Sequence, residues 1–208
     1  MNARVRIKFC GITRVEDAQC AAALGVDAIG LVMTRASSRF LHLDQALQVR
    51  RIIPPWMAAV ALFMNDDPIW IEQVVASLKP DCLQFHGGED EEQCRRYNIP
   101  YLKAIAADKV ETVDRWDRYY ESAAGIVVDS HAGGVKGGSG TAFDWSKLPG
   151  SIPRPWFLAG GLNPANVAEA ISQAHPYGVD VSTGIESAAG IKDAIAMRHF
   201  VDEVMRVR

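Results

Sequence analysis

The sequence predicts an α/β fold, a single (β/α)8 TIM barrel domain over residues 1–208, from three observations. Eight short apolar runs alternate along the chain with amphipathic stretches. The runs are rich in Val, Ile, Leu and Ala without strict polar alternation, which is typical of parallel strands buried on both faces. The 208 residues leave about 26 for each strand–helix unit, enough for a strand, a helix and two short loops.

The expected strands follow one another without an intervening linker. An open doubly wound sheet is the alternative fold, but it usually has about five or six strands and a Gly-rich loop after the first one. In this chain that loop reads Cys-Gly-Ile-Thr. The predicted strands cover residues 5–9, 28–33, 58–64, 82–85, 101–105, 125–128, 156–158 and 179–181.

Helix start signals lie between these strands. Thr13 and Glu16 have the spacing of a capping box, so we expect the first helix to begin there. Gly25 and Gly178 come just before strands two and eight, where a turn after a helix favours glycine. Three further starts pair a capping residue with Pro or Glu: Asp67 before Pro68, Asp108 before Glu111, and Asn163 before Pro164.

Composition and charge exclude several classes of protein. The chain is 49% hydrophobic and 23% charged with a formal net charge of −3, so nucleic acid and anionic membranes are not expected partners. The longest apolar stretch, residues 57–64, is too short to span a bilayer, and we expect a cytoplasmic protein. The four cysteines show no zinc-type or disulfide pattern and are expected to be reduced thiols.

Cys10 stands where the first expected strand ends and the first helix is about to begin. A thiol at this place would face the positive end of a helix dipole, which favours thiolate over thiol. It could then act as a base or a nucleophile. The alternative is a small buried hydrophobe, because free cysteine is among the most buried residue types. The segment alone leaves both interpretations open.

Glycine-rich segments follow the last three expected strands, at the end of the barrel where such enzymes carry their chemistry. Backbone amides there often bind phosphate, and glycine lets the backbone approach an anion closely. The segment after strand six is also typical of a flexible linker. We predict a small phosphorylated ligand bound by Gly138, Ser139, Gly140, Gly160, Gly161, Ser182, Thr183 and Gly184.

Asp129 ends the sixth apolar run and is a second candidate chemical group. A carboxyl group that is poorly solvated there would have a raised pKa and could donate a proton near neutrality. The alternative is an ordinary loop cap that binds turn amides. A thiolate that takes a proton and an acid that gives one form a complementary pair, which favours an isomerisation.

Nine short motifs follow one another along almost the whole chain. They are KFCGIT at 8–13, SSRF at 37–40, LFMN at 62–65, LQFHG at 83–87, VVDS at 127–130, GGSG at 137–140, FDW at 143–145, LAGGL at 158–162 and VDVSTGIE at 179–186. Any one motif is weak evidence of a protein family, but the set of motifs in this order is specific. On these motifs the chain resembles the phosphoribosylanthranilate isomerases, a (β/α)8-barrel family of tryptophan biosynthesis.

The resemblance implies an Amadori rearrangement of N-(5-phosphoribosyl)anthranilate to 1-(2-carboxyphenylamino)-1-deoxyribulose 5-phosphate, without metal or cofactor. Asp129 matches the family's general acid and Cys10 its general base. Arg39 would hold the anthranilate carboxylate, since a guanidinium fork matches that planar anion. His86 and Asp180 are expected to contact the substrate.

Four residues depart from the pattern expected of that family. Met33 and Met64 stand where Phe and Val are expected, and Thr141 and Ala142 follow the GGSG motif where lysine is frequent. Methionine fills gaps adaptably, so the first two matter little. The missing lysine could weaken anion attraction, although the backbone amides after strands seven and eight should suffice for the phosphate.

Two other functions stay open at this point. One is another phosphosugar isomerase or epimerase, but a metal-dependent epimerase needs more histidines or carboxylates at the barrel mouth than His86 and Asp129. The other is a non-catalytic barrel that binds a phosphorylated metabolite, which would have no use for both Cys10 and Asp129. The sequence is compatible with a monomer or a homodimer.

Overall fold

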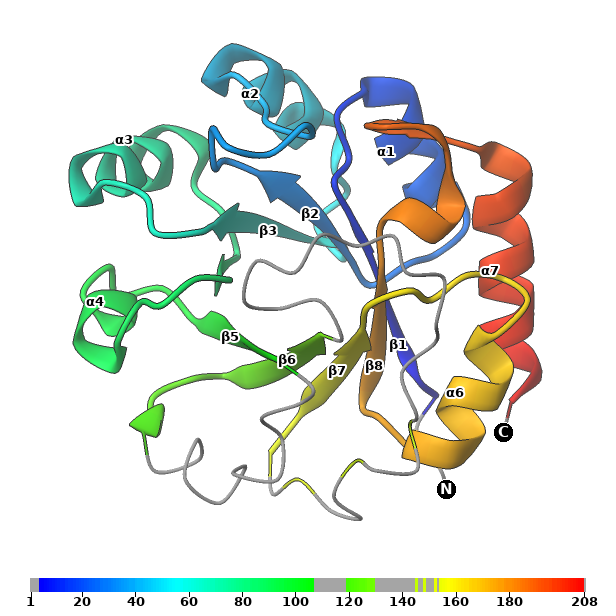
Figure 1. Cartoon of the computed structure of the whole chain (residues 1–208). Helices are drawn as coiled ribbons and strands as arrows, with labels where there is room; N and C mark the ends of the chain where they lie inside the picture. Colours follow the sequence, from blue (N-terminus) through cyan, green and yellow to red (C-terminus); the bar gives the residue numbers. More distant parts are fainter. Residues whose placement is uncertain are drawn as a thin grey trace.

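The computed structural model describes residues 4–106, 119–129, 145, 148, 152 and 154–207. Eight parallel strands close into a barrel in which β1 pairs with both β2 and β8, so the predicted fold is confirmed (Figure 1). Most strand ends agree with the prediction to within one residue. The strands are β1 (Arg6–Cys10), β2 (Ala28–Val32), β3 (Ala58–Phe63), β4 (Cys82–Phe85), β5 (Tyr101–Ala106), β6 (Gly125–Asp129), β7 (Trp156–Ala159) and β8 (Gly178–Val181).

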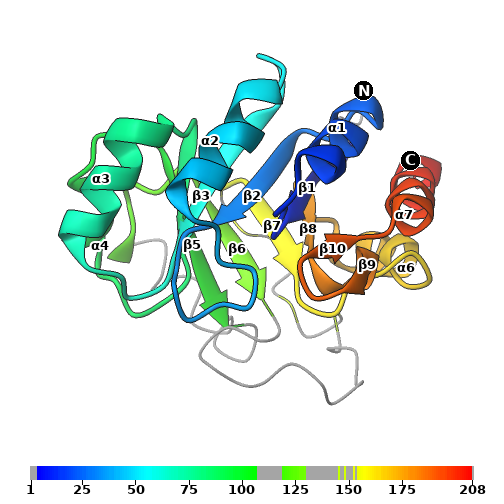
Figure 2. The ribbon, with the colours of Figure 1, turned by 90° about the horizontal axis from the view of Figure 1, so that it is seen from above.

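Helices surround the barrel on the outside (Figures 1 and 2). A 3-10 turn, η3 (Thr183–Ile185), follows β8, and a short antiparallel hairpin of β9 (Glu186–Ala188) and β10 (Ile191–Lys192) precedes the last helix. None of the helices in the described ranges is long and apolar enough to cross a membrane. The helices are α1 (Val15–Ala23), α2 (Leu43–Ile52), α3 (Pro68–Leu78), α4 (Glu91–Arg95), α6 (Val167–Ala174) and α7 (Ala194–Arg206).

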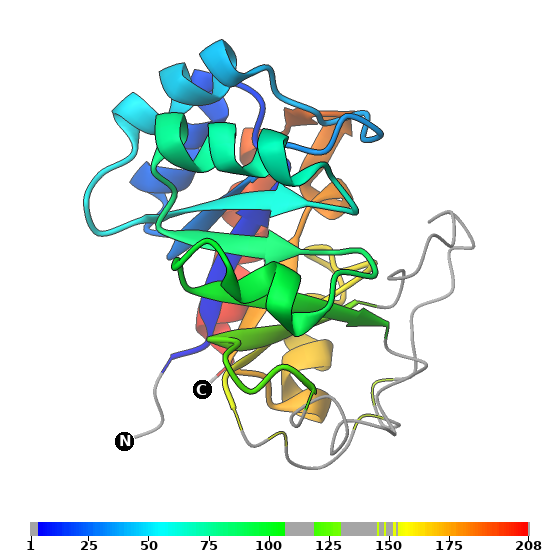
Figure 3. The same ribbon diagram turned by 90° about the vertical axis from the view of Figure 1, so that its left-hand side faces the viewer.

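Alternation along each strand divides the core into two layers. In β1, Ile7 and Phe9 belong to the large cluster between the sheet and the helices, and the Phe9 ring contacts Phe200 of α7 with centroids 6.0 Å apart. Cys10 belongs instead to a small cluster with Val32 and Leu62. The eight barrel strands all run in one direction, so their carboxyl ends meet at one side of the molecule (Figure 3).

The predicted helix start at Asp67 is confirmed, and the one at Asn163 is refined by the structure. The Asp67 carboxylate accepts a hydrogen bond from the Ile69 amide at 2.7 Å, with Pro68 as the first residue of α3. Asn163 accepts from the Ala165 amide at 2.8 Å, but this turn precedes α6, which begins at Val167. The predicted start at Asp108 lies outside the described residues.

The capping box at Thr13 is wrong. Helix α1 has Arg14 as its N-cap residue without a side-chain cap, and the Thr13 hydroxyl donates instead to the carbonyl of Gly190. The hydroxyl therefore ties the β1–α1 loop to the β9–β10 hairpin, a partner that sequence spacing cannot indicate.

The two glycines expected in turns behave differently. Gly25 lies in the turn after α1 with a φ of +72°, as predicted. Gly178 is the first residue of β8, so its predicted place in a turn is wrong. A Cβ atom at Gly178 would lie 2.5 Å from a ring carbon of Phe157, and glycine is needed there for close packing with β7.

Candidate active site

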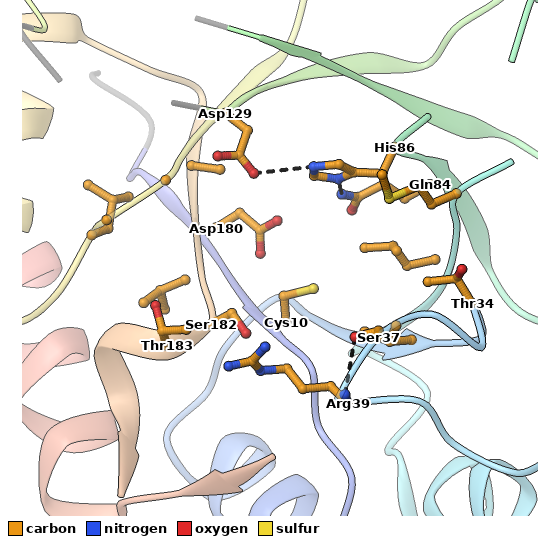
Figure 4. Close-up of a pocket in the computed structure, with 18 of the residues that line it drawn as sticks. Cys10, Thr34, Ser37, Arg39, Gln84, His86, Asp129, Asp180, Ser182 and Thr183 are labelled. Carbon is orange, nitrogen blue, oxygen red and sulfur yellow. Dashed lines mark hydrogen bonds and ion pairs between the residues drawn. The ribbon is translucent and has the colours of Figure 1, made fainter. Parts of the chain in front are cut away.

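A cavity of about 700 Å³ opens at the carboxyl ends of the strands. It gathers most of the residues that the sequence analysis selected, from six different strands or the loops after them (Figure 4). Gly138, Ser139 and Gly140 lie outside the described residues. The predicted residues that line the cavity are Cys10, Arg39, His86, Asp129, Gly160, Gly161, Asp180, Ser182 and Thr183.

Cys10 ends β1 with its side chain directed into the cavity (Figure 4). Burial raises the pKa of its thiol, while the nearby Lys8 ammonium opposes that effect and the Asp180 carboxylate adds to it. The expectation that a helix dipole favours the thiolate is therefore wrong. Helix α1 begins only at Val15, so Cys10 lies outside the first turn, where the dipole acts.

Lys8 and Asp180 form a buried ion pair beneath this thiol. Lys8 stands two residues before Cys10 on β1, and Asp180 is its register partner on β8. The Lys8 Nζ lies 2.8 Å from Asp180 Oδ2, and the two side chains are only 1% and 6% exposed. Asp180 Oδ1 is also buried but has no hydrogen-bond partner within the part of the chain that the structure describes. The carboxylate thus retains one acceptor toward the cavity.

Asp129 ends β6, and its Oδ2 lies 3.3 Å from the Nε2 of His86. The other imidazole nitrogen, Nδ1, lies 3.3 Å from the Gln84 side-chain amide. The Gln84 amide thus contacts one imidazole nitrogen, and the other faces the Asp129 carboxyl group. His86 is therefore placed to orient the Asp129 carboxyl group, and both residues belong to the candidate site.

Arg39 reaches the cavity wall from the loop after β2 and is held there by Glu186. Its Nε and Nη2 donate to the two carboxylate oxygens at 2.7 and 2.6 Å, a bidentate pair. Lys192 donates to the same carboxylate at 2.8 Å and to the Ser182 carbonyl at 3.0 Å. Burial alone raises the pKa of Glu186, but these hydrogen bonds and charges outweigh it, and the pKa is lowered.

Gly160 and Gly161 form the turn after β7 with φ values of +87° and +69°, a conformation that favours glycine. The Gly161 carbonyl accepts from the Asn166 side chain at 3.0 Å, which fixes the turn beside Ser182 and Thr183 at the cavity. Gly184 does not line the cavity. A Cβ atom there would lie 1.9 Å from the Leu162 carbonyl oxygen, so this glycine allows the two loops to approach each other.

Sequence reasoning missed three charged residues of this site. Lys8 is one of two charged residues in the first predicted strand, with Arg6, and it stands two residues from Cys10. A period of two is the signal that places Lys8 and Cys10 on one face. Glu186 and Lys192 carry no comparable signal, because their partners Arg39 and Ser182 come from other parts of the chain.

The closed parallel barrel and the cavity at the strand carboxyl ends define the class of (β/α)8-barrel enzymes. Within that class, the family described as N-(5'phosphoribosyl)anthranilate (PRA) isomerase matches residues 7–203 of this chain. The chain belongs to this family.

Individual relatives agree with that assignment. The N-(5'-phosphoribosyl)anthranilate isomerase of Stenotrophomonas maltophilia (strain R551-3) is 50% identical over 98% of this chain and 94% of its own length. That of Pseudomonas aeruginosa (strain UCBPP-PA14) is 46% identical over 96% and 95%. The crystal structure of phosphoribosyl anthranilate isomerase from Thermotoga maritima superimposes with a TM-score of 0.88 at 34% identity, covering 97% of this chain and 99% of that one.

A further solved structure contains a ligand. It is a phosphoribosyl anthranilate isomerase in complex with reduced 1-(O-carboxyphenylamino)-1-deoxyribulose 5-phosphate, with a TM-score of 0.82 and 32% identity over 97% of this chain and 99% of that one. That related protein therefore accommodates a sugar phosphate and an aromatic carboxylate together.

Proposed function

We propose that this protein converts N-(5-phosphoribosyl)anthranilate to 1-(2-carboxyphenylamino)-1-deoxyribulose 5-phosphate in tryptophan biosynthesis. The observation that carries the proposal is the presence of Cys10 and Asp129 in one cavity, at the ends of β1 and β6. Membership of the isomerase family and the ligand of the related structure support the same reaction. The chemistry needs one proton donor and one proton acceptor at separate atoms of the sugar.

Asp129 acts first, as the general acid. It donates a proton to the furanose ring oxygen, the bond between that oxygen and C1 breaks, and the nitrogen lone pair forms a Schiff base with C1. His86, 3.3 Å from the Asp129 carboxyl group, orients the acid toward the sugar. The ring opens without an added cofactor, because the substrate nitrogen supplies the electron pair.

Cys10 acts second, as the general base. The iminium makes the neighbouring C2 hydrogen acidic, and the thiolate removes it to give an enolamine. The enolamine then tautomerises to the ketone, with C1 receiving a proton and the C2 hydroxyl losing one. No bond between sulfur and carbon forms, so Cys10 is a base rather than a nucleophile.

The remaining residues hold the two ends of the substrate. The Arg39 guanidinium, held through Nε and Nη2 by Glu186, presents its remaining edge to the anthranilate carboxylate. The backbone of Gly160, Gly161, Ser182 and Thr183 binds the phosphate. The buried Oδ1 of Asp180 accepts a hydrogen bond from the substrate.

The direct test follows the loss of anthranilate fluorescence on turnover in the wild type and in Cys10→Ser and Asp129→Asn. We expect each variant to lose roughly 10²- to 10⁴-fold in kcat, the usual contribution of a general acid or base. Cys20→Ser is the matched control, because Cys20 lies on α1 and does not line the cavity, and its rate should stay near wild type. Near-full activity of Cys10→Ser or Asp129→Asn contradicts the mechanism, and substrate binding without wild-type turnover favours a non-catalytic barrel.

The phosphate site has a separate test. Gly161→Asp places a negative charge on the turn that approaches the anion and forces a side chain onto a φ of +69°. We expect KM to rise by at least about tenfold, since like charges meet in a partly buried site. An unchanged KM removes this turn from the phosphate site.

A further inference from the structure

We propose that Lys8 is a positioning residue for this reaction, whose buried ammonium group makes the thiol of Cys10 available as a base. The inference rests on the proposed function in one respect, since it takes Cys10 to be that base. Its physical content is independent of turnover, because it concerns the ionisation of one thiol.

The first argument is position. Lys8 and Cys10 alternate with the outward-facing Phe9 on β1, so both side chains point into the barrel. Both also lie over Gly30 of β2, the register partner of Cys10. A Cβ atom at Gly30 would be 2.8 Å from the Cys10 sulfur and 3.2 Å from the Lys8 nitrogen. The two groups therefore share the space that the missing side chain leaves free.

The second argument is charge. A thiolate in a buried site is costly unless a cation stands beside it. Among the described residues, the charged groups that act on Cys10 come from four elements: Lys8 on β1, Asp180 on β8, Lys192 on β10 and Arg39 in the loop after β2. Lys192 and Arg39 both bind the Glu186 carboxylate, which offsets their charge. The ammonium of Lys8 opposes the rise in the Cys10 pKa more than any other group does.

The third argument is the free-energy cost of burying this ion pair. Lys8 is 1% exposed, and an apolar pair of similar volume often stabilises a protein as well as a buried ion pair does. Asp180 binds the ammonium through one oxygen only, and the Cys10 sulfur is a second group that favours the charged form of Lys8.

The test measures thiol ionisation without turnover. Cys20, Cys82 and Cys94 are first replaced by alanine, so that Cys10 is the one thiol left, and the rate of its alkylation by iodoacetamide is followed against pH. In this background we compare Lys8→Met, the neutral double variant Lys8→Met/Asp180→Asn, and Asp180→Asn alone. Lys103→Met is the matched control, because it removes the lysine of another buried pair, which Lys103 forms with Glu89.

We expect both Lys8→Met proteins to titrate Cys10 at least about one pH unit higher than the parent, with alkylation near neutral pH slower by about tenfold. Asp180→Asn should titrate at or below the parent value, because it removes the anion and keeps the cation. Lys103→Met should leave the midpoint in place. Lys8→Arg keeps the positive charge and should restore the parent midpoint.

An unchanged Cys10 midpoint in the double variant overturns the proposal. So does a higher midpoint in Asp180→Asn, and this variant decides the question if the Lys8→Met proteins do not fold. The pH profile of kcat/KM separates this inference from the proposed function. If the alkylation midpoint moves and the basic group in the kinetic profile does not, Lys8 controls the thiol but Cys10 is not the base.

Discussion

Two buried lysine–carboxylate pairs stand in different parts of the same barrel, and they differ in how completely the carboxylate is hydrogen-bonded. Lys103 of β5 lies 2.9 Å from Glu89 Oε2 and donates to the Gly87 carbonyl at 2.7 Å. Glu89 also accepts from the Asn65 amide at 2.6 Å and the Gly87 amide at 2.9 Å. Both oxygens of this carboxylate are occupied.

The pair of Lys8 and Asp180 lies beneath the cavity and is only partly satisfied. One carboxylate oxygen binds Lys8, and the other is buried without a partner among the described residues. A fully bonded buried network fixes the loops it joins, whereas an open acceptor costs free energy until a ligand supplies a donor. On this comparison we expect the Glu89 pair to stabilise the loops after β3 and β4, and the Asp180 pair to act on a ligand in the cavity.

The largest expected effect is on stability, in Glu89→Gln. This change leaves the Lys103 ammonium buried without its anion and removes hydrogen bonds that join two loops. We expect the free energy of unfolding to fall by about 3–5 kcal/mol, as measured by urea denaturation. Asp180→Asn should lose less, because among the described residues the Asp180 carboxylate accepts a hydrogen bond from Lys8 alone. Equal losses in the two variants would remove the distinction between the pairs.

The next effect is on activity, in Asp180→Asn. The amide that replaces the carboxylate can satisfy Lys8 with its oxygen, but it then turns an NH2 group toward the cavity in place of an acceptor. We expect kcat/KM to fall by about 10- to 100-fold, which corresponds to the loss of a buried charge-assisted hydrogen bond. Glu89→Gln, assayed at a temperature where it is folded, should retain more activity. The reverse order of the two activities contradicts the assignment.

Glu186 tests an intermediate case, since its two oxygens are occupied but its partner Arg39 lies on the cavity wall. In Glu186→Gln the guanidinium loses one of its two acceptors and is less firmly held. We expect KM to rise by about three- to tenfold with little change in kcat, the pattern of lost substrate binding. Glu169→Gln is the control, because this carboxylate accepts from Gln173 on the surface of α6. A fall in kcat alone would place Glu186 in the chemical step.

The smallest effect is the acid dependence of the Glu89 pair. Burial alone raises the pKa of Glu89, but the Lys103 charge and the hydrogen bonds to the carboxylate outweigh it and lower the pKa in the folded protein. The stability from this group is therefore present above the unfolded pKa and is lost as the pH falls through the folded value. The gap in unfolding free energy between wild type and Glu89→Gln should shrink from about pH 6 to about pH 3. A constant gap over that range contradicts the lowered pKa.

Much of the site could be predicted because it follows strand ends. Cys10, Asp129 and Asp180 stand at or near the carboxyl ends of apolar runs, and in a closed parallel barrel all such ends meet at one mouth. The local signals of helix capping were less dependable than the strand ends. Thr13 and Glu16 have the spacing of a cap, yet the hydroxyl binds Gly190, which is 177 residues away along the chain.

The sequence by itself determined the eight strands, the closed barrel and the strand ends that carry the candidate acid and base, because hydrophobic periodicity is a local property. Only the tertiary structure decided the electrostatics. Closure of the barrel sets β1 against β8 and so brings Lys8 to Asp180, and it buries Cys10 deeply enough to reverse the expected direction of its pKa shift. A pKa depends on charges and solvent within a few ångströms, and for Cys10 these charges include Asp180 and Lys192, which are distant in the sequence.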